Sequence, residues 1–180
     1  MSIQVDDKIS LEFLGEIHAA SLFNLVNNNR AYLKEWLPWV DNMQVVEHAG
    51  NYIVNCIRQA AERTDFAYAI MFDGNMVGRI GMHHINQQNK IGEIGYWLAG
   101  GMQGRGIVAK CCTALISYGF NELGLNRIEI KCATGNDKSR AIPEKLKFKR
   151  EGILRQAEWL NGNFVDLYLY SMLKEEWEML

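Results

Sequence analysis

Three strand-like segments follow one another between residues 66 and 98, with only tight turns between them. Residues 66–72 are rich in strand formers, Asp73-Gly74 is a hairpin-turn dipeptide, and residues 76–85 resume as a second strand. The polar cluster at 86–89 makes the next turn, before a third strand at 91–98. The three segments therefore predict an antiparallel meander. The chain shows no βαβ alternation, which argues against Rossmann and P-loop nucleotide folds.

The rest of the chain surrounds this meander with helices and further strands. Apolar residues at helical spacing predict helices around 19–26, at 44–63, at 107–120 and at 138–146. Strands are expected at 10–13 and 127–133, and a closing hairpin of 149–159 and 164–173 flanks Asn161-Gly162. The aromatic-rich segment 29–39 contains Pro38 and is expected to be a structured connection. The fold class is α+β, with a mostly antiparallel mixed sheet of about seven strands and helices on both faces.

Length and composition narrow the class of protein. The 180 residues are 48% apolar, enough for one core, so residues 1–180 are expected to form a single domain. A net charge of −2 offers no basic surplus for nucleic-acid binding. Four cysteines without C-x-x-C spacing lie in apolar runs, which indicates buried thiols in a reducing compartment and neither a zinc site nor a disulfide. No apolar stretch approaches a membrane span and no signal peptide is evident, so we expect a cytoplasmic protein with no metal.

A glycine-rich turn joins the third meander strand to the helix at 107–120. Its residues are Gln103, Gly104, Arg105, Gly106, Ile107 and Val108. Glycines let the backbone approach phosphate oxygens, and the amides at the start of a helix lie at the positive end of its dipole. The turn lacks both the Gly-Lys-Ser/Thr of a P-loop and the G-x-G-x-x-G of a dinucleotide fold. It indicates a pyrophosphate site of another kind, with an ordinary strand-to-helix loop as the alternative.

The turn resembles the coenzyme A loop of the GCN5-related N-acetyltransferases, Gln/Arg-x-x-Gly-x-Gly/Ala, and departs from it at Val108. The similarity extends along nearly the whole chain and points to the RimJ/RimL branch, which acetylates ribosomal-protein N-termini. Its other segments are 29–39, EIGYWL at 93–98, Asn136-x-x-Ser139, Lys145-Leu146-x-Phe148, Glu151-Gly152 and Glu176-Trp177. Lys147 replaces the family's glycine and Pro143 interrupts the short helix, so this segment is expected to be locally distorted.

The resemblance implies an acetyl-CoA-dependent N-acetyltransferase. It implies a sheet splayed between the fourth and fifth strands, and direct attack by a primary amine, with the N-terminal α-amine of a protein as the favoured acceptor. One alternative is a small amine such as a polyamine, an amino acid or an aminoglycoside. Another is a non-catalytic acyl-CoA sensor. The resemblance leaves the acceptor, the pathway and homodimerisation open.

The chemistry needs a base for the amine, an oxyanion donor and a proton for the thiolate. Glu93 is the first candidate for the base, because its position resembles that of the family's glutamate; Glu158 is the second and Asp166 the third. Ser139 matches the family position near the sulfur. Asn136 is expected to bond the pantetheine amide, to cap its helix, or both.

The remaining expectations concern the cofactor site and the large polar and aromatic side chains. In the family the oxyanion donor is a backbone N–H at the splay, and the resemblance places it near Leu98. Coenzyme A is expected to contact Leu98, together with Gln103, Gly104, Arg105, Gly106, Ile107, Val108, Asn136 and Ser139. The adjacent His83 and His84 should point to opposite faces of their strand and are assigned no role. Trp36, Trp39 and Trp97 fit either an acceptor groove or the core.

Overall fold

The segments between residues 66 and 98 form the predicted meander. In the computed structural model, which describes residues 2–180, they are β3 (Phe66–Phe72), β4 (Asn75–Asn86) and β5 (Ile91–Leu98), paired antiparallel. Asp73 and Gly74 both have positive φ, 47° and 76°, as a tight hairpin turn with the twist of the sheet requires.

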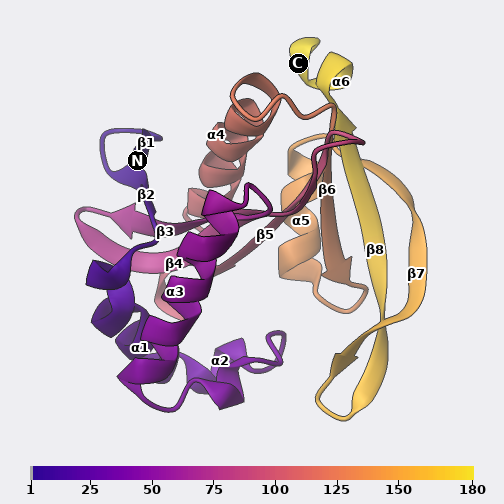
Figure 1. Cartoon of the computed structure of the whole chain (residues 1–180). Coiled ribbons are helices and arrows are strands. Elements are labelled where there is room, and N and C mark those ends of the chain that lie inside the picture. Colours follow the sequence, from indigo (N-terminus) through magenta and orange to yellow (C-terminus); the bar gives the residue numbers. More distant parts are fainter. Residues whose placement is uncertain (1) are drawn as a thin grey trace.

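The complete sheet has eight strands in the order β1-β2-β3-β4-β5-β6-β8-β7 (Figure 1). The outer strands are β1 (Ser2–Gln4), β2 (Ile9–Phe13), β6 (Arg127–Ala133), β7 (Lys149–Leu160) and β8 (Asn163–Leu173). The strand beyond the seven expected is β1, whose three residues are too few to show a pattern. Every neighbouring pair is antiparallel except β5 and β6, whose parallel pairing across the following helix makes one βαβ unit where the sequence patterns indicated none.

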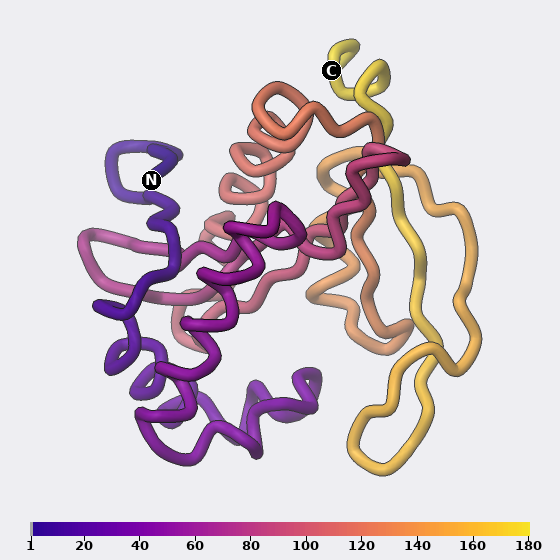
Figure 2. Tube along the Cα trace, viewed as in Figure 1, coloured from indigo at the N-terminus to yellow at the C-terminus, as the bar shows by residue number. Residues whose placement is uncertain are grey.

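The sheet splays between β5 and β6, the fourth and fifth of the predicted strands. Their parallel pairing covers only three residue pairs, from Ile91 opposite Arg127 to Glu93 opposite Glu129. Beyond Glu93 the two strands separate, while β5 stays paired with β4 and β6 with β8. The Cα trace shows the two halves of the molecule diverging below this junction (Figure 2).

Helices cover both faces of the sheet. On one face lie α1 (Ala19–Asn28) and α3 (Val46–Ala61), which share an apolar cluster with Ala67, Ala69 and Trp97. The other face carries the larger cluster, with α4 (Ile107–Asn121) at its centre and α5 (Asp137–Lys145) beside α4. Eight residues of α4 are buried, as expected for a helix that is apolar almost all round. The chain ends in α6 (Lys174–Glu178), a short helix that the sequence patterns did not predict.

The segment 29–39 is the structured connection that its composition indicates. It contains one helical turn, α2 (Arg30–Leu33), and continues into a 3-10 turn at Val40–Asn42; two further 3-10 turns lie at Glu16–His18 and Gly100–Met102. The Arg30 guanidinium donates to the carbonyls of Val40 and Met43, at 2.6 and 2.5 Å, and so ties the connection together.

Within residues 2–180, no helix is long and apolar enough to span a membrane. All four cysteines are buried and free.

Candidate active site

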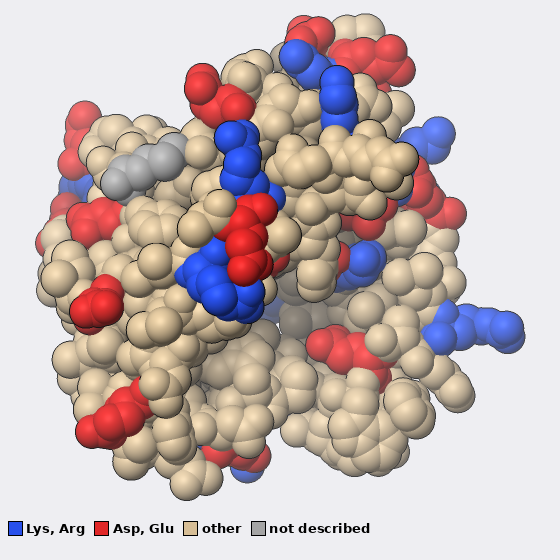
Figure 3. Space-filling model, in the orientation of Figure 1, with Lys and Arg blue, Asp and Glu red and all other residues tan. Residues whose placement is uncertain are grey.

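The splay between β5 and β6 opens into a cavity of about 1190 Å³. Its walls come from both helical layers, including Tyr52 of α3, Ile107 of α4 and Ser139 of α5, so the cavity passes through the plane of the sheet. The space-filling view shows a hollow at the middle of one face, bordered by both acidic and basic side chains (Figure 3). A cavity of this size and depth can hold an extended ligand that reaches from one face to the other.

The glycine-rich turn forms part of the cavity wall, which all six of its residues line. Gly104 and Gly106 have a φ of +74°, and a Cβ at either position would meet no atom within 4 Å. Glycine is therefore favoured there by the backbone conformation rather than by lack of space. Gly106 is the N-cap of α4 and provides no side-chain cap, and no acidic residue lies in the first turn of that helix. The first amides of α4 can thus meet an anion, which fits a pyrophosphate.

Polar side chains flank this turn. The Gln103 amide donates to the Tyr32 hydroxyl, and its Oε1 accepts from Lys138 Nζ at 3.1 Å. Lys138 was not among the predicted cofactor residues, although it is a cation at the rim of the cavity. Arg105 is exposed, and within residues 2–180 its guanidinium bonds only the Gly101 carbonyl, at 3.4 Å. Val108 is half-buried and lines the cavity.

The start of α5 brings two predicted residues together. Asn136 caps this helix, because its Oδ1 accepts from the Ser139 backbone amide at 3.0 Å. Ser139 Oγ lies 3.4 Å from the Tyr96 hydroxyl, which itself donates to the Ser139 carbonyl at 2.9 Å. Burial raises the pKa of Tyr96 well above its usual value, so the phenol stays protonated. Tyr96 lines the cavity and was not predicted as a site residue.

The two carboxylates expected to compete for the role of base lie in different surroundings. Glu93 Oε2 is 2.8 Å from Lys131 Nζ and 3.3 Å from His84 Nδ1, and its side chain is not part of the cavity wall. Glu158 lines the cavity, and its carboxylate makes no ion pair or hydrogen bond with any described residue. Burial, and then the negative charge of Glu93, raise the pKa of Glu158.

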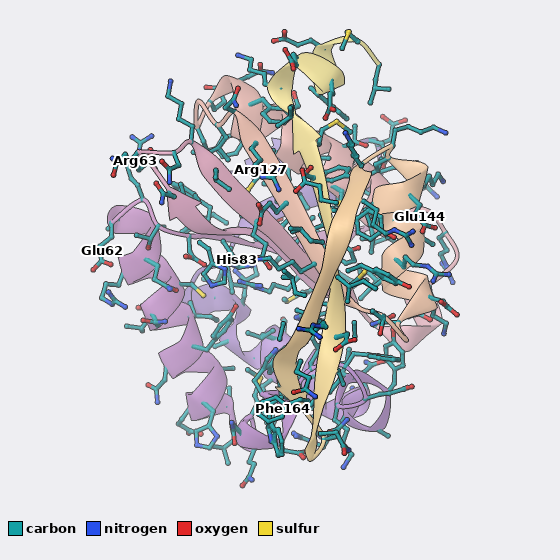
Figure 4. The ribbon with its side chains drawn as sticks, turned by 90° about the vertical axis from the view of Figure 1, so that its right-hand side faces the viewer. Glu62, Arg63, His83, Arg127, Glu144 and Phe164 are labelled. Atoms are coloured by element: carbon teal, nitrogen blue, oxygen red, sulfur yellow. The ribbon has the colours of Figure 1, made fainter. Side chains whose placement is uncertain are left out.

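An irregularity in β7 directs Glu158 to this position. The pairing with β8 shifts register between Leu154 and Glu158, and Gln156 within the shift has a φ of +50°. Asp166 Oδ1 accepts from the Gln156 amide at 2.7 Å and so holds the bulge. Asp166 itself does not line the cavity. Strand β7 twists across β8 above the hairpin tip that carries Phe164 (Figure 4).

The expectation that His83 and His84 point to opposite faces is wrong. A register shift interrupts β4 after His83, and His84 has a φ of +49°. Both imidazoles line the cavity, with ring centroids 6.4 Å apart. Strict alternation holds only in a regular strand, and a bulge removes it.

His83 belongs to a polar cluster that the sequence patterns did not reveal. Its Nδ1 is 2.6 Å from Asp65 Oδ1, and Arg79 Nη1 is 2.9 Å from its Nε2. Because arginine only donates, Nε2 is the acceptor and Nδ1 carries the proton that bonds Asp65. Burial lowers the pKa of His83, which is consistent with this neutral imidazole. Asp65 is 18 residues away along the chain, so no local spacing could have indicated the pair.

The three tryptophans expected in an acceptor groove or in the core lie at the cavity, and two of them also pack in a core cluster. Trp36, Trp39 and Trp97 all line the cavity. Trp97 is also buried in the cluster beneath α1 and α3, with its ring 6.1 Å from that of Trp39. Their rings therefore contribute apolar surface to the cavity lining.

Comparison with known proteins identifies relatives over almost the whole chain. Residues 9–149 match the acetyltransferase (GNAT) domain. A putative ribosomal N-acetyltransferase of Bacillus subtilis (strain 168), YdaF, is 38% identical over 97% of this chain and 96% of that protein. The ribosomal-protein-serine acetyltransferase of Escherichia coli (strain K12) is 30% identical, with 96% of each chain covered. Among solved structures, the ribosomal L7/L12 α-N-protein acetyltransferase RimL in complex with coenzyme A superposes with a TM-score of 0.94 at 29% identity, over 98% of this chain and 99% of that one.

Proposed function

The chain belongs to the GNAT family of acetyltransferases, and from this membership we propose that it acetylates the N-terminal α-amine of a ribosomal-type protein with acetyl-CoA. Two relatives that match nearly its full length are named for ribosomal acceptors. The observation that carries the proposal is the Glu158 carboxylate, which has no ionic partner among the described residues, in a cavity that a pyrophosphate-compatible turn also lines.

Acetyl-CoA supplies the activated acetyl group, and the residues of this chain would bind and orient it. The amides of residues 104–108 at the start of α4 would donate to the pyrophosphate oxygens, with Arg105 and Lys138 as nearby cations. The Asn136 cap uses only the side-chain oxygen, so its amide NH₂ can donate to a pantetheine carbonyl. Both roles expected of Asn136 are then compatible.

The unpaired edge of β5 offers an oxyanion donor. The Ala99 amide donates to the Val77 carbonyl on the β4 side, at 2.8 Å. Since successive amides of a strand point to opposite edges, the Leu98 N–H points toward the splay. A backbone amide directed into a cavity can stabilise the developing oxyanion of a thioester under attack.

The surroundings of the two carboxylates favour Glu158 over Glu93 as the base. Glu93 is engaged by Lys131 and His84, whereas Glu158 faces the cavity with a raised pKa. A carboxylate with a raised pKa is a better proton acceptor from an ammonium group. In the reaction the amine nitrogen bonds the carbonyl carbon, its proton goes to Glu158 directly or through water, and the C–S bond breaks. The thiolate takes the second proton that the attacking nitrogen releases, relayed through water and the Ser139 hydroxyl, which lines the cavity.

A thiol-release assay tests this function. Purified protein is given acetyl-CoA with a panel of N-terminal peptides and small amines, and free coenzyme A is measured. We expect turnover with peptides, a loss of about 10²- to 10⁴-fold in Glu158→Gln, and a loss of less than tenfold in Glu93→Gln. Turnover confined to small amines would overturn the proposed acceptor. A larger loss in Glu93→Gln than in Glu158→Gln would overturn the proposed base.

A further inference from the structure

Pro143 leaves one backbone carbonyl of α5 without its helical donor. In a regular helix the amide of residue 143 would donate to the carbonyl of Ser139, four residues earlier. Proline has no amide hydrogen, and its ring pushes the carbonyl of residue i−4 outward. Pro143 lies inside α5 and is buried. The carbonyl that it affects therefore belongs to Ser139, which lines the cavity.

The Tyr96 hydroxyl is the donor to the carbonyl that Pro143 leaves without a helical hydrogen bond. Its hydroxyl donates to the Ser139 carbonyl at 2.9 Å, across the splay from β5 to α5. The same phenolic oxygen lies 3.4 Å from Ser139 Oγ, close enough to accept a weak hydrogen bond from it. The tyrosine hydrogen is committed to the carbonyl, so its oxygen can act toward Ser139 only as an acceptor.

Ser139 is thus fixed at three points. Asn136 Oδ1 accepts from its amide, and Tyr96 holds both its carbonyl and its hydroxyl. The 3.4 Å contact to the hydroxyl is the weakest of the three, so Ser139 Oγ–H can turn toward another acceptor at little cost.

We propose that Tyr96 and Pro143 are positioning residues for Ser139: the proline frees the Ser139 carbonyl, and the tyrosine uses that carbonyl to aim the Ser139 hydroxyl at the leaving sulfur. This inference rests on the proposed function, because it concerns the protonation of the thiolate in that reaction. Neither residue touches the reacting atoms in this scheme. Both act through Ser139.

The proposal predicts strong non-additivity between variants. We expect Tyr96→Phe to lower kcat about tenfold with the KM for acetyl-CoA changed less than twofold, because phenylalanine keeps the ring and removes only the hydroxyl. In a Ser139→Ala background, Tyr96→Phe should cost less than twofold, since no hydroxyl remains to be aimed. A further tenfold loss in that background would show that Tyr96 acts on its own, and would overturn the proposal.

Pro143→Ala tests the role of the proline, with one readout that needs no ligand and one that measures turnover. Alanine restores an amide that competes for the Ser139 carbonyl, so we expect the ¹³Cζ resonance of Tyr96 to shift in protein labelled at tyrosine, and kcat to fall at least threefold. Arg140→Ala, on the same helix but outside the cavity wall, should leave both readouts unchanged. An unmoved Tyr96 resonance in Pro143→Ala overturns the role of the proline.

If wild-type protein releases no thiol with any amine, the proposed function fails. If wild type turns over and Tyr96→Phe matches it, only this inference fails.

Discussion

Lys147 has a backbone conformation that favours glycine. It follows α5 with a φ of +65°, its amide bonds the Glu144 carbonyl, and the Phe148 amide bonds the Pro143 carbonyl at 2.9 Å. This is the Schellman arrangement in which the residue after the cap is usually glycine. We expect Lys147→Gly to raise the free energy of unfolding by about 1 kcal/mol, hence Tm by about 2–4 °C. Thermal unfolding checks this, with Lys145→Gly, inside the helix, expected to lower Tm. A lower Tm in Lys147→Gly would show that the positive φ of Lys147 does not destabilise the protein.

The raised pKa of Glu158 has a consequence for stability. A carboxyl group whose pKa is higher in the folded than in the unfolded state contributes stability at low pH, which is lost as the pH rises through the folded-state value. We therefore expect Glu158→Gln to be more stable than wild type near neutral pH, with the difference shrinking below about pH 4, near the ordinary glutamate pKa. Denaturant unfolding of both proteins at several pH values measures this difference in the free energy of unfolding.

A matched pair of variants isolates the charge of Glu93 in this effect. Because Glu93 helps to raise the pKa of Glu158, introducing Glu158→Gln into a Glu93→Gln background should produce a smaller gain at neutral pH than in wild type. An equal gain in both backgrounds would mean that burial alone causes the shift.

Single residues were predictable where a local rule or the family resemblance constrains them. The glycine-rich turn was one such case, and the Lys147 substitution was another, since the resemblance marked it as a site of distortion. The engagement of Glu93 was not predictable, because its partner Lys131 lies 38 residues away on another strand. Nor was the shared orientation of His83 and His84, because nothing in the sequence marks the bulge that follows His83.

At the scale of the element, the bulge in β7 determines where Glu158 points. A side chain supports the bulge through the 2.7 Å bond from the Gln156 amide to Asp166 Oδ1. We expect Asp166→Ala to lower the free energy of unfolding by about 1 kcal/mol and to lower kcat several-fold, although Asp166 does not line the cavity. Gln156→Gly, which suits the φ of +50°, should preserve kcat. Denaturant unfolding and steady-state turnover are measured for both variants. If Asp166→Ala keeps the wild-type kcat, the bond that supports the bulge is not needed for catalysis.

Long elements were more predictable than their irregularities. The helix expected at 44–63 is Val46–Ala61, and that at 107–120 is Ile107–Asn121, because each has a sustained apolar pattern. The hairpin around Asn161-Gly162 also matches, with both turn residues at positive φ. Short elements such as β1 and α6 have too few residues for periodicity. The bulge at 155–157 depends on a contact with the partner strand and has no local signature.

At the scale of the whole molecule, the cavity depends on the meeting of segments far apart in the chain. The splay between β5 and β6 was expected only through the family resemblance, since strand patterns do not specify where pairing ends. The tip of the β7–β8 hairpin approaches the segment after α2, as the Cα trace also shows (Figure 2). Trp36 of this segment and Glu158 of the hairpin line the same cavity, so the contact joins two of its walls.

Asn161 makes that contact, and its loss should affect the acceptor more than the cofactor. Its Nδ2 donates to the carbonyls of Lys34 and Glu35, at 3.1 and 3.2 Å. Asn161→Gly removes both bonds and still accommodates the φ of 49°, so the hairpin turn should persist. We expect the KM for a peptide acceptor to rise several-fold, with the KM for acetyl-CoA changed less than twofold. Hydrogen exchange at residues 34–37 should become faster, because the segment loses its tether.

Asn163→Ala is the matched control, since Asn163 Nδ2 bonds only within its own hairpin. If both variants keep the wild-type KM for the peptide, the two walls do not cooperate in binding the acceptor.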